Sequence, residues 1–522
     1  MAIIVSVAPI LCLVVLMLAC KMSGWKSAVI TLVVTFCLMV FAAPSPGVVA
    51  DAHWTQPIAL ATWSVVEGAL KAFFPIVLII LTAIFSYNIL VESKQIDVIK
   101  SQITSLTDDR GILVLVITWG FGGLLEGMAG FGTAVAIPAA ILIGLGFKPF
   151  FSAFVSLLAN TVATGFAAVG VPITTLCNEA SGGMASAEMI REVSAFSILQ
   201  LSPLFFLIPF VILILTERNA WVKNVLLSLW VGGVSLAAQF VCAWKLGAET
   251  PAIIGSIAAI LALIVASKFV AKQSERKQAY GAKSFFKAWS VYLFILLFIL
   301  LSGPLCQPVN AFLKSHLVMT LQIPVTGSVF KFGWISNAAL MIFLGSVIGG
   351  FAQGLSIKRQ TVVLAKTIIS LKHTTITIVS LIAMASLMNY SGMITTIASG
   401  MIAVTGDYYP LFAPIIGAIG TFVTGSDTSS NILFAKLQAA AAGHLGMTGT
   451  HTYLGVTGQE TNWLLASNTT GATGGKMISP QSVAIATAAC EMRDSDAALL
   501  RSAIPYALAY VAIGGLLVYL CQ

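Results

Sequence analysis

The sequence has 522 residues, of which 58% are hydrophobic and only 9% are charged. A soluble domain carries roughly 25% charged residues, so this composition excludes a soluble globular protein and predicts a polytopic membrane protein covered by lipid. The net charge of +8 then describes orientation in the membrane, and we expect no nucleic-acid partner. The eight cysteines show no CxxC or metal-ligand spacing. We therefore expect packing residues, without disulfides, a metal or a cofactor.

About twelve apolar runs can form spanning helices, each of which needs about 20 mostly apolar residues. In chain order they lie near residues 2–20, 28–43, 57–91, 150–176, 194–215, 222–243, 251–270, 289–307, 335–355, 375–398, 462–490 and 502–521. Two further apolar stretches, 112–146 and 410–446, are interrupted by glycine-rich polar turns. Each is too long for one helix and too short for two spans. We therefore predict two re-entrant hairpins whose tips are buried in protein or line a cavity.

The basic residues predict how these segments are oriented. With the N-terminus outside and alternating spans, 20 of the 27 basic residues fall in loops on the inner side, the side that such residues prefer. The first hairpin then enters from the cytoplasm and the second from outside. The predicted organisation is an N-terminal half 1–270 with the hairpin 112–146 and a broken helix 150–176, a cytoplasmic basic linker 271–288, and a C-terminal half 289–522 with the hairpin 410–446 and a broken helix 462–490.

The two halves resemble each other weakly. Asn160-Thr161 precedes Pro172 by the same spacing as Asn468-Thr469 precedes Pro480. Inverted repeats with interrupted helices are typical of secondary transporters, which bind substrate near the bilayer midplane where the breaks meet. The predicted fold is therefore all-α, with about twelve transmembrane helices and two re-entrant hairpins in an inverted-repeat arrangement.

Few ionisable residues lie inside the apolar runs, where each costs several kcal/mol. They are Glu67, Lys71, Glu126, Asp427, Lys436 and Lys476. Glu67 and Lys71 are four residues apart and can pair on one helix. Glu126 and Asp427 lie in the two hairpin turns, where a carboxylate in low dielectric can bind and release a proton. We predict proton coupling for both, the alternative being a carboxylate that pairs with a lysine or caps a half-helix.

Two polar segments, 425-GSDTSSN-431 and 467-SNTTGATGG-475, interrupt the apolar pattern of the second half. Their residues break helices, and a helix N-terminus with free N–H groups attracts anions. Lys436 or Lys476 could add a positive charge, which together favours a site for a small carboxylate. The oxygens of the same groups could instead bind Na⁺, so these residues leave the coupling ion open.

The sequence resembles the L-lactate permease family over its full length. The resemblance is carried by the motifs 126-EGMAGFGTAVAI-137, 144-GLGFKP-149, 424-TGSDTSSNILF-434 and 468-NTTGATGGKMISPQSVAIA-486. Met128 and Ala134 stand where the family usually has Ala and Pro, which bears on substrate preference. The resemblance implies a bacterial inner-membrane carrier that takes up L-lactate, and often D-lactate and glycolate, with protons. Ser467-Asn468-Thr469 is also similar to the turn that holds substrate and ion in the wider superfamily of carboxylate carriers.

The candidate site comprises the hairpin turns and the helix breaks. The proton-coupling candidates are Glu126 and Asp427, and the substrate-binding candidates are Gly130, Phe131, Gly132, Thr133, Asn160, Thr161, Ser426, Thr428, Ser429, Ser430, Asn431, Lys436, Ser467, Asn468, Thr469, Thr470, Lys476 and Ser479. The expected partners are a small monocarboxylate, protons and lipid, with a possible homo-oligomer. Na⁺-coupled uptake of a dicarboxylate and a passive channel are the alternatives within transport. An intramembrane enzyme is disfavoured because every histidine falls near a loop or a helix end.

Overall fold

The computed structural model confirms a polytopic, predominantly helical membrane protein. The residues it describes are 2–20, 22–42, 57–128, 130, 132–183, 185–270, 281–302, 306–492 and 495–522. Within these ranges nine helices are long and apolar enough to cross a membrane, or up to 11 if each of two bent pairs is one span. Two predicted spans, 2–20 and 335–355, contain shorter apolar helices, Ile3–Met17 and Ala338–Ala352.

The elements before residue 271 contain the hairpin within 112–146, called hairpin 1, and the first broken helix within 150–176. The helices are α1 (Ala2–Val14), α2 (Gly24–Ala42), α3 (Pro57–Lys71), α4 (Leu78–Glu92), α5 (Gln95–Thr104), α6 (Arg110–Leu115), α7 (Gly123–Met128), α8 (Thr133–Gly144), α9 (Pro149–Ala159), α10 (Ala167–Ala180), α11 (Ala187–Thr216), α12 (Trp221–Leu246) and α13 (Pro251–Val270). The π-helical stretches are Val15–Ala19, Ala72–Val77 and Val116–Gly122, and a 3₁₀ turn covers Val162–Phe166. Phe74 is non-helical, so the run 57–91 is broken at this residue.

The elements after residue 280 contain the hairpin within 410–446, called hairpin 2, and a second interrupted helix. The interruption falls between Lys476 and Pro480 and not within 467–475 as predicted, because that polar segment is helical in α22. The helices are α14 (Ala282–Ser302), α15 (Gln307–Ser315), α16 (Ala338–Ala352), α17 (Ile357–Ser370), α18 (Lys372–Tyr390), α19 (Met393–Thr405), α20 (Tyr409–Thr424), α21 (Asp427–His444), α22 (Glu460–Lys476), α23 (Pro480–Ala489) and α24 (Asp496–Leu520). A 3₁₀ turn covers Gly406–Tyr408, and the strands are β1 (Val318–Gln322), β2 (Val329–Gly333), β3 (Thr450–Tyr453) and β4 (Val456–Gln459). Antiparallel pairing joins β1 to β2 and β3 to β4.

Several elements differ from the sequence-based expectations. The predicted span 375–398 is wrong in its end, because α18 stops at Tyr390 and Gly392 turns the chain with a φ of 73°. The two β-hairpins and the amphipathic helix α17 were not expected, since hydropathy detects long apolar runs and not short or amphipathic segments. Of the predicted linker 271–288, residues 271–280 lie outside the described residues, and α14 begins at Ala282.

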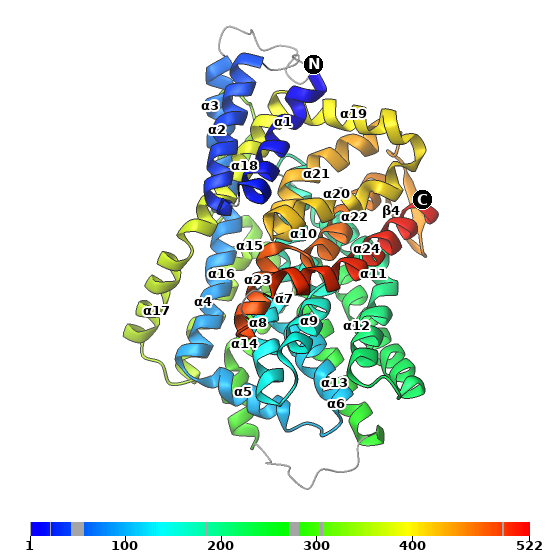
Figure 1. Ribbon diagram of the computed structural model, residues 1–522. Coiled ribbons are helices and arrows are strands. Elements are labelled where there is room, and N and C mark those ends of the chain that lie inside the picture. The colour runs from blue at the N-terminus through cyan, green and yellow to red at the C-terminus, as the bar shows by residue number, and fades with distance from the viewer. Residues whose placement is uncertain are drawn as a thin grey trace.

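Both predicted hairpins have the shape of a helix, a short break and a returning helix. In hairpin 1, the helical run α6–α7 ends at Met128 and α8 packs back against its π-helical part. In hairpin 2, α20 ends at Thr424, Gly425 has a φ of 73°, and α21 returns along α20. The central part of Figure 1 shows α7–α10 (cyan and teal) beside α20–α23 (orange to red), and α8 contacts α23 while α10 contacts α21.

Small residues allow α20 and α22 to pack closely. A Cβ added to Gly471 of α22 would lie 1.6 Å from the Pro414 carbonyl oxygen, and one added to Gly475 would lie 2.2 Å from the Ala418 carbonyl oxygen. A Cβ on Gly417 of α20 would lie 2.0 Å from the Asn468 carbonyl oxygen. Such backbone approach is how small residues stabilise helix pairs in lipid. It fixes α22 against hairpin 2.

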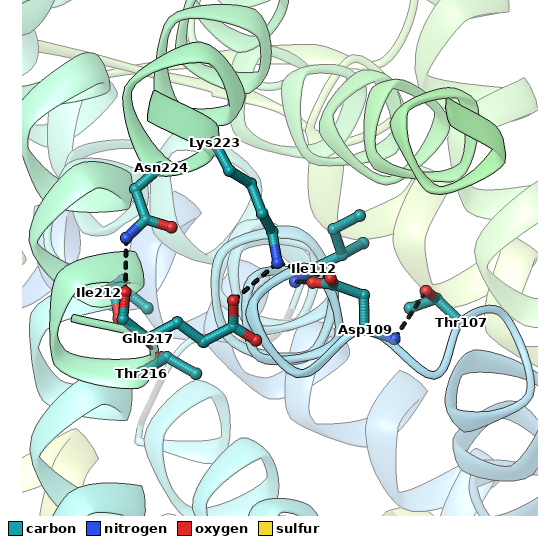
Figure 2. Close-up of polar contacts among 8 residues, drawn as sticks. All are labelled: Thr107, Asp109, Ile112, Ile212, Thr216, Glu217, Lys223 and Asn224. Atoms are coloured by element: carbon teal, nitrogen blue, oxygen red, sulfur yellow. Dashed lines mark hydrogen bonds and ion pairs between the residues drawn. The ribbon is translucent and has the colours of Figure 1, made fainter. Parts of the chain in front are cut away.

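Hairpin 1 is anchored at its base by an ion-pair cluster (Figure 2). The Lys223 Nζ lies 2.5 Å from Asp109 Oδ2 and 2.7 Å from Glu217 Oε2, and so joins α12, the start of α6 and the end of α11. Asp109 also caps α6, since its Oδ1 accepts a hydrogen bond from the Ile112 N–H at 2.9 Å. The Asn224 amide donates to the Glu217 carbonyl. One lysine thus ties the entry of the hairpin to two spanning helices.

Candidate transport site

A cavity of about 410 Å³ lies where the two hairpins meet the interrupted helices. It is lined from hairpin 1 by Glu126, Gly130 and Gly132, and from hairpin 2 by the segment 423–429. The first broken helix contributes Thr164 and part of α10. Residues of α4, α22 and α23, the α1–α2 turn and the start of α18 complete the lining. Segments from both halves of the chain therefore form a single chamber.

Three helix N-termini converge on this cavity. α8 begins after Gly132, whose φ of 84° directs the chain into the helix. α21 begins at Asp427 after the N-cap Ser426, and α23 begins at Pro480 after the N-cap Ser479. The first N–H groups of a helix have no backbone partner within it, and they carry partial positive charge. The Ser426 hydroxyl accepts from the Ser429 N–H of α21 and the Ser479 hydroxyl from the Ser482 N–H of α23, and the other first N–H groups of these helices remain. Because all three ends contribute lining residues, the cavity favours an anion.

The first broken helix also turns sharply beside the cavity. Ala168, Val169 and Gly170 all have left-handed backbone, with φ values of 44°, 60° and 77°. Such a conformation is strained for Ala, and more so for the β-branched Val. It allows α10 to restart at Val171, which lines the cavity together with Ala168. Backbone strain stored here shapes the wall of the chamber.

Two carboxylates and one lysine supply the charges of the cavity. Glu126 and Asp427 are 1% and 3% exposed, and each interacts electrostatically with Lys476. Among the described residues, no group lies within hydrogen-bond distance of either oxygen of Asp427 or of Oε2 of Glu126, and Thr164 and Thr421 are the hydroxyls that interact with Asp427. The Lys476 Nζ donates to the Gly425 carbonyl at 2.8 Å. Buried carboxylate oxygens without partners are costly.

Comparison with known proteins identifies the group to which this arrangement belongs. The family model described as L-lactate permease matches residues 2–522. The chain belongs to the L-lactate permease family. It is thus a multi-pass protein of the bacterial inner membrane, in a family of transport proteins.

Curated relatives of this L-lactate permease family member cover most of its length. The L-lactate permease of Streptococcus iniae is 37% identical over 453 residues, which are 85% of this chain and 91% of the relative. The glycolate permease GlcA of Escherichia coli (strain K12) is 32% identical over 562 residues, covering 99% and 95%. The L-lactate permease of Bacillus subtilis (strain 168) is 31% identical over 537 residues, covering 94% and 90%.

Two solved transporters share the fold. MtrF of Neisseria gonorrhoeae superimposes with a TM-score of 0.50 at 12% identity, covering 95% of this chain and 94% of its own. YdaH of Alcanivorax borkumensis superimposes with a TM-score of 0.51 at 13% identity, covering 95% and 96%. At this identity the likeness concerns the fold alone.

The structure brings some of the predicted site residues of this family member together and leaves others outside the cavity. Those that line it are Glu126, Gly130, Gly132, Ser426, Asp427, Thr428, Ser429 and Lys476. Those not among its lining residues are Thr133, Asn160, Thr161, Ser430, Asn431, Lys436, Ser467, Asn468, Thr469, Thr470 and Ser479. Phe131 lies outside the described residues. Asn160 is buried outside the lining, and among the described residues neither atom of its side-chain amide has a hydrogen-bond partner.

Asn431 and Asn468 join neighbouring elements through buried hydrogen bonds. The Asn431 amide donates to the Pro172 carbonyl at 2.9 Å and to Thr469 Oγ1 at 3.0 Å. The Asn468 amide donates to Asn431 Oδ1 at 2.8 Å, and Gln438 donates to Asn468 Oδ1 at 3.3 Å. This buried network joins hairpin 2 to α22 and to the first broken helix. In this structure these side chains therefore bind protein rather than face the cavity.

Lys436 belongs to a second group of buried charges. Its Nζ lies 3.7 Å from Glu179 Oε2, between α21 and α10. Nearby, the Lys71 Nζ lies 2.6 Å from Glu67 Oε1, which confirms the predicted pair. The Tyr390 hydroxyl donates to the other oxygen of Glu67 at 2.9 Å. We therefore assign Lys436 to an ion-pair cluster apart from the chamber.

Several lining residues were not found by sequence reasoning. Trp25 and His373, stacked with ring centroids 5.1 Å apart, line the cavity from α2 and α18. No local signal marks them, because they meet only through the tertiary fold. Gln481 and Ser482 also line it. The pattern Ser479-Pro480, a cap followed by proline at the first helical position, was the signal that could have placed them.

Proposed function

We propose that this protein takes up L-lactate, and also D-lactate and glycolate, in symport with protons. The observation that carries the proposal is the single cavity in which three helix N-termini and Lys476 face two buried carboxylates with unpartnered oxygens. Its relatives include an L-lactate permease and a glycolate permease, which supports the choice of substrate. The inverted orientation of the two hairpins, inferred from charge, supports a carrier over a channel.

The lining suits a short 2-hydroxymonocarboxylate. The substrate carboxylate would sit at the N-terminus of α21 and near Lys476, where N–H groups and an ammonium favour negative charge. The hydroxyls of Thr428 and Ser429 line the same wall and can exchange hydrogen bonds with the substrate hydroxyl. Lys476 is the one lysine or arginine among the described lining residues. A dicarboxylate would bring a second negative charge for which the cavity has no second lysine.

Charge balance explains why protons would accompany the substrate. With both carboxylates ionised, Glu126, Asp427 and Lys476 sum to a charge of −1. One bound proton makes the empty site neutral, and a bound monocarboxylate returns it to −1 in a low-dielectric environment, where charge is costly. A second proton restores neutrality. The site therefore favours one proton taken up with each monocarboxylate.

Transport by purified protein in liposomes tests the proposal. We expect an inward proton gradient to drive accumulation of labelled L-lactate, D-lactate and glycolate to compete, and succinate and citrate not to compete. Collapsing the gradient with a protonophore should stop accumulation. If a Na⁺ gradient drives uptake and a proton gradient does not, the coupling is wrong. Equilibration without accumulation would indicate a channel.

Lys476 provides a test of the site itself. We expect Lys476→Gln to raise the KM for lactate about tenfold or more, a loss of about 1.4 kcal/mol or more of binding, because the cation facing the substrate is removed. The matched control is Lys331→Gln, which changes an exposed lysine on β2 outside the cavity. An unchanged KM in Lys476→Gln protein would remove this lysine from substrate binding.

A further inference from the structure

A second and larger cavity of about 510 Å³ lies away from the transport site, between α5, α7, α13 and α14. Its wall is almost entirely aliphatic and aromatic. Side chains of α13 form one side, among them Ile253, Ile257 and Ile264, and Leu293 and Leu296 of α14 face them. Cavities of about 300–1,000 Å³ with apolar walls are the usual size for small-molecule sites. In a membrane, such a crevice between helices is suited to an acyl chain.

The polar residues of this crevice gather at one end. Ser267 and Lys268 stand at the end of α13, Gln102 near the end of α5, and Trp289 near the start of α14. The Trp289 indole N–H donates to Gln102 Oε1 at 2.9 Å. The remaining lining residues of that end include Phe285, which stacks on Trp289 with ring centroids 5.7 Å apart. Aromatic residues of this kind mark the membrane–water interface.

Two buried polar groups at the crevice lack protein partners. Gln102 is 8% exposed and Tyr292 is 4% exposed, and both line the crevice. Among the described residues, the Gln102 Nε2 and the Tyr292 hydroxyl have no hydrogen-bond partner. Both groups can donate a hydrogen bond. A ligand with acceptor oxygens near the polar end would satisfy them, whereas a pure hydrocarbon would not.

The length and charge of the crevice indicate which ligand it takes. From Lys268 to Ile253 the crevice follows α13 for about 22 Å at 1.5 Å per residue. The hydrocarbon of one leaflet is about 15 Å thick, half of the bilayer core, so the crevice is long enough to hold the full length of an acyl chain from that leaflet. The described lining includes one lysine and no carboxylate, and Lys283 and Lys287 are exposed on the first turns of α14. The charge pattern places this end at the cytoplasm, where basic pockets between helices bind anionic head groups.

We propose that this crevice binds an anionic phospholipid of the cytoplasmic leaflet. One acyl chain lies along α13, the ester oxygens accept from Gln102 and Tyr292, and the phosphate pairs with Lys268. The same acyl chain also reaches Leu124 and Met128, which line the crevice from α7. These two residues flank Glu126 in sequence, and Glu126 faces the other cavity. Lipid bound here therefore supports the back of hairpin 1.

Photo-crosslinking tests this proposal without any transport measurement. The full-length protein is reconstituted in phosphatidylcholine with a trace of phosphatidylglycerol that carries a photoreactive acyl chain, and crosslinked peptides are mapped by mass spectrometry. We expect label on α13 and α14 around Ile257 and Leu293. An excess of unlabelled phosphatidylglycerol should compete at least threefold better than phosphatidylcholine.

Two variants and a matched control test separately how the lipid head group and the acyl chain contribute to binding. Lys268→Gln should lower the labelling at least threefold, and Ile257→Trp, which fills the crevice, should abolish it. Lys358→Gln, an exposed lysine on α17, should leave it unchanged. Equal competition by phosphatidylcholine, or unchanged labelling of Lys268→Gln protein, would overturn the anionic site. Absence of lipid label, together with crosslinks between two copies across α13 and α14 when a bifunctional crosslinker is added, would assign the crevice to a second copy instead.

Discussion

The two carboxylates of the transport cavity differ in their helical positions. Asp427 is the first residue of α21, where the partial positive charge of the helix N-terminus stabilises an anion. Glu126 lies in the last turn of the continuous helical run α6–α7, which ends at Met128, and that end of a helix carries partial negative charge. Both are buried and line the same chamber. We therefore expect both to be needed for coupling, with unequal effects of their neutralisation.

Neutralising Asp427 should uncouple transport. We expect Asp427→Asn to abolish accumulation of lactate driven by a proton gradient while sparing exchange of internal for external lactate, because exchange needs no net proton movement. Uptake and counterflow in the same proteoliposomes measure the two activities. Asp407→Asn, which changes an exposed carboxylate before α20, is the control. Full accumulation by the Asp427→Asn protein would remove this residue from the mechanism.

A titratable residue outside the spans gives a second prediction, on stability. Burial raises the pKa of Glu249, in the loop between α12 and α13, to about 7, against the opposing effect of Lys314. Between its ordinary value near 4.5 and 7 the folded protein holds more protons than the unfolded chain. Stability contributed by this group is thus present below about pH 4.5 and is lost as pH rises through 7.

Substituting Glu249 tests the predicted direction in which stability changes with pH. We expect Glu249→Gln to raise the melting temperature in detergent by about 1–3 °C at pH 8 and to change it little at pH 5, because the neutral amide cannot become charged. Glu188→Gln, which changes an exposed residue in the first turn of α11, is the control. A larger effect at pH 5 than at pH 8 would contradict the raised pKa.

Among the elements, the crossing of α20 and α22 allows the least change. Gly471 and Gly475 face carbonyl oxygens of α20 at separations that leave no room for a Cβ. Overpacking a tight core typically costs about 1–3 kcal/mol, and here the obstacle is backbone, which cannot rotate away. The crossing fixes the second interrupted helix on hairpin 2, so its geometry also sets the position of Lys476.

A pair of glycine substitutions tests this crossing. Gly471→Ala should cost about 3 kcal/mol or more, and we expect it to lower the yield of monodisperse protein and its melting temperature. Gly443→Ala is the matched control on α21, because a Cβ there meets nothing within 4 Å and alanine favours the helix. Equal behaviour of the two variants would mean that the helices separate at the crossing without loss.

Some elements could be predicted from sequence and others could not. Hydropathy and the glycine-rich turns indicate the long spans and both hairpin breaks, because apolar length and helix breakers are local properties. The left-handed turn at Ala168 and Val169 carries no such mark, since neither residue favours that backbone. Asn431 and Asn468 were grouped with the substrate by their polarity, but polarity alone does not distinguish a ligand contact from a buried network.

At the scale of the whole molecule, the cavity extends towards one face of the protein. Its lining includes Met22 and Trp25 at the α1–α2 turn and His373 at the start of α18, two regions that the basic residues place at the cytoplasm. The chamber thus extends from the hairpin tips towards the inner face.

Native cysteines test this orientation. Cys20, exposed in the α1–α2 turn, should react with a membrane-impermeant maleimide in inside-out vesicles but not in right-side-out ones. Cys306, between α14 and α15, should show the opposite pattern. Peptide mass spectrometry distinguishes the two sites. Labelling of Cys20 from the outer face would reverse the topology, and with it the direction in which the cavity opens.

The contact between Lys476 and the Gly425 carbonyl has a consequence for the transport cycle. That oxygen belongs to the bend of hairpin 2, and an arriving anion would compete with it for the same ammonium. The Lys476 contact would then hold the bend of hairpin 2 in place when the cavity is empty, and a bound anion would release it. Binding of the substrate would then itself allow the conformational change of transport. The empty protein would stay in place and would not carry protons across the membrane without substrate.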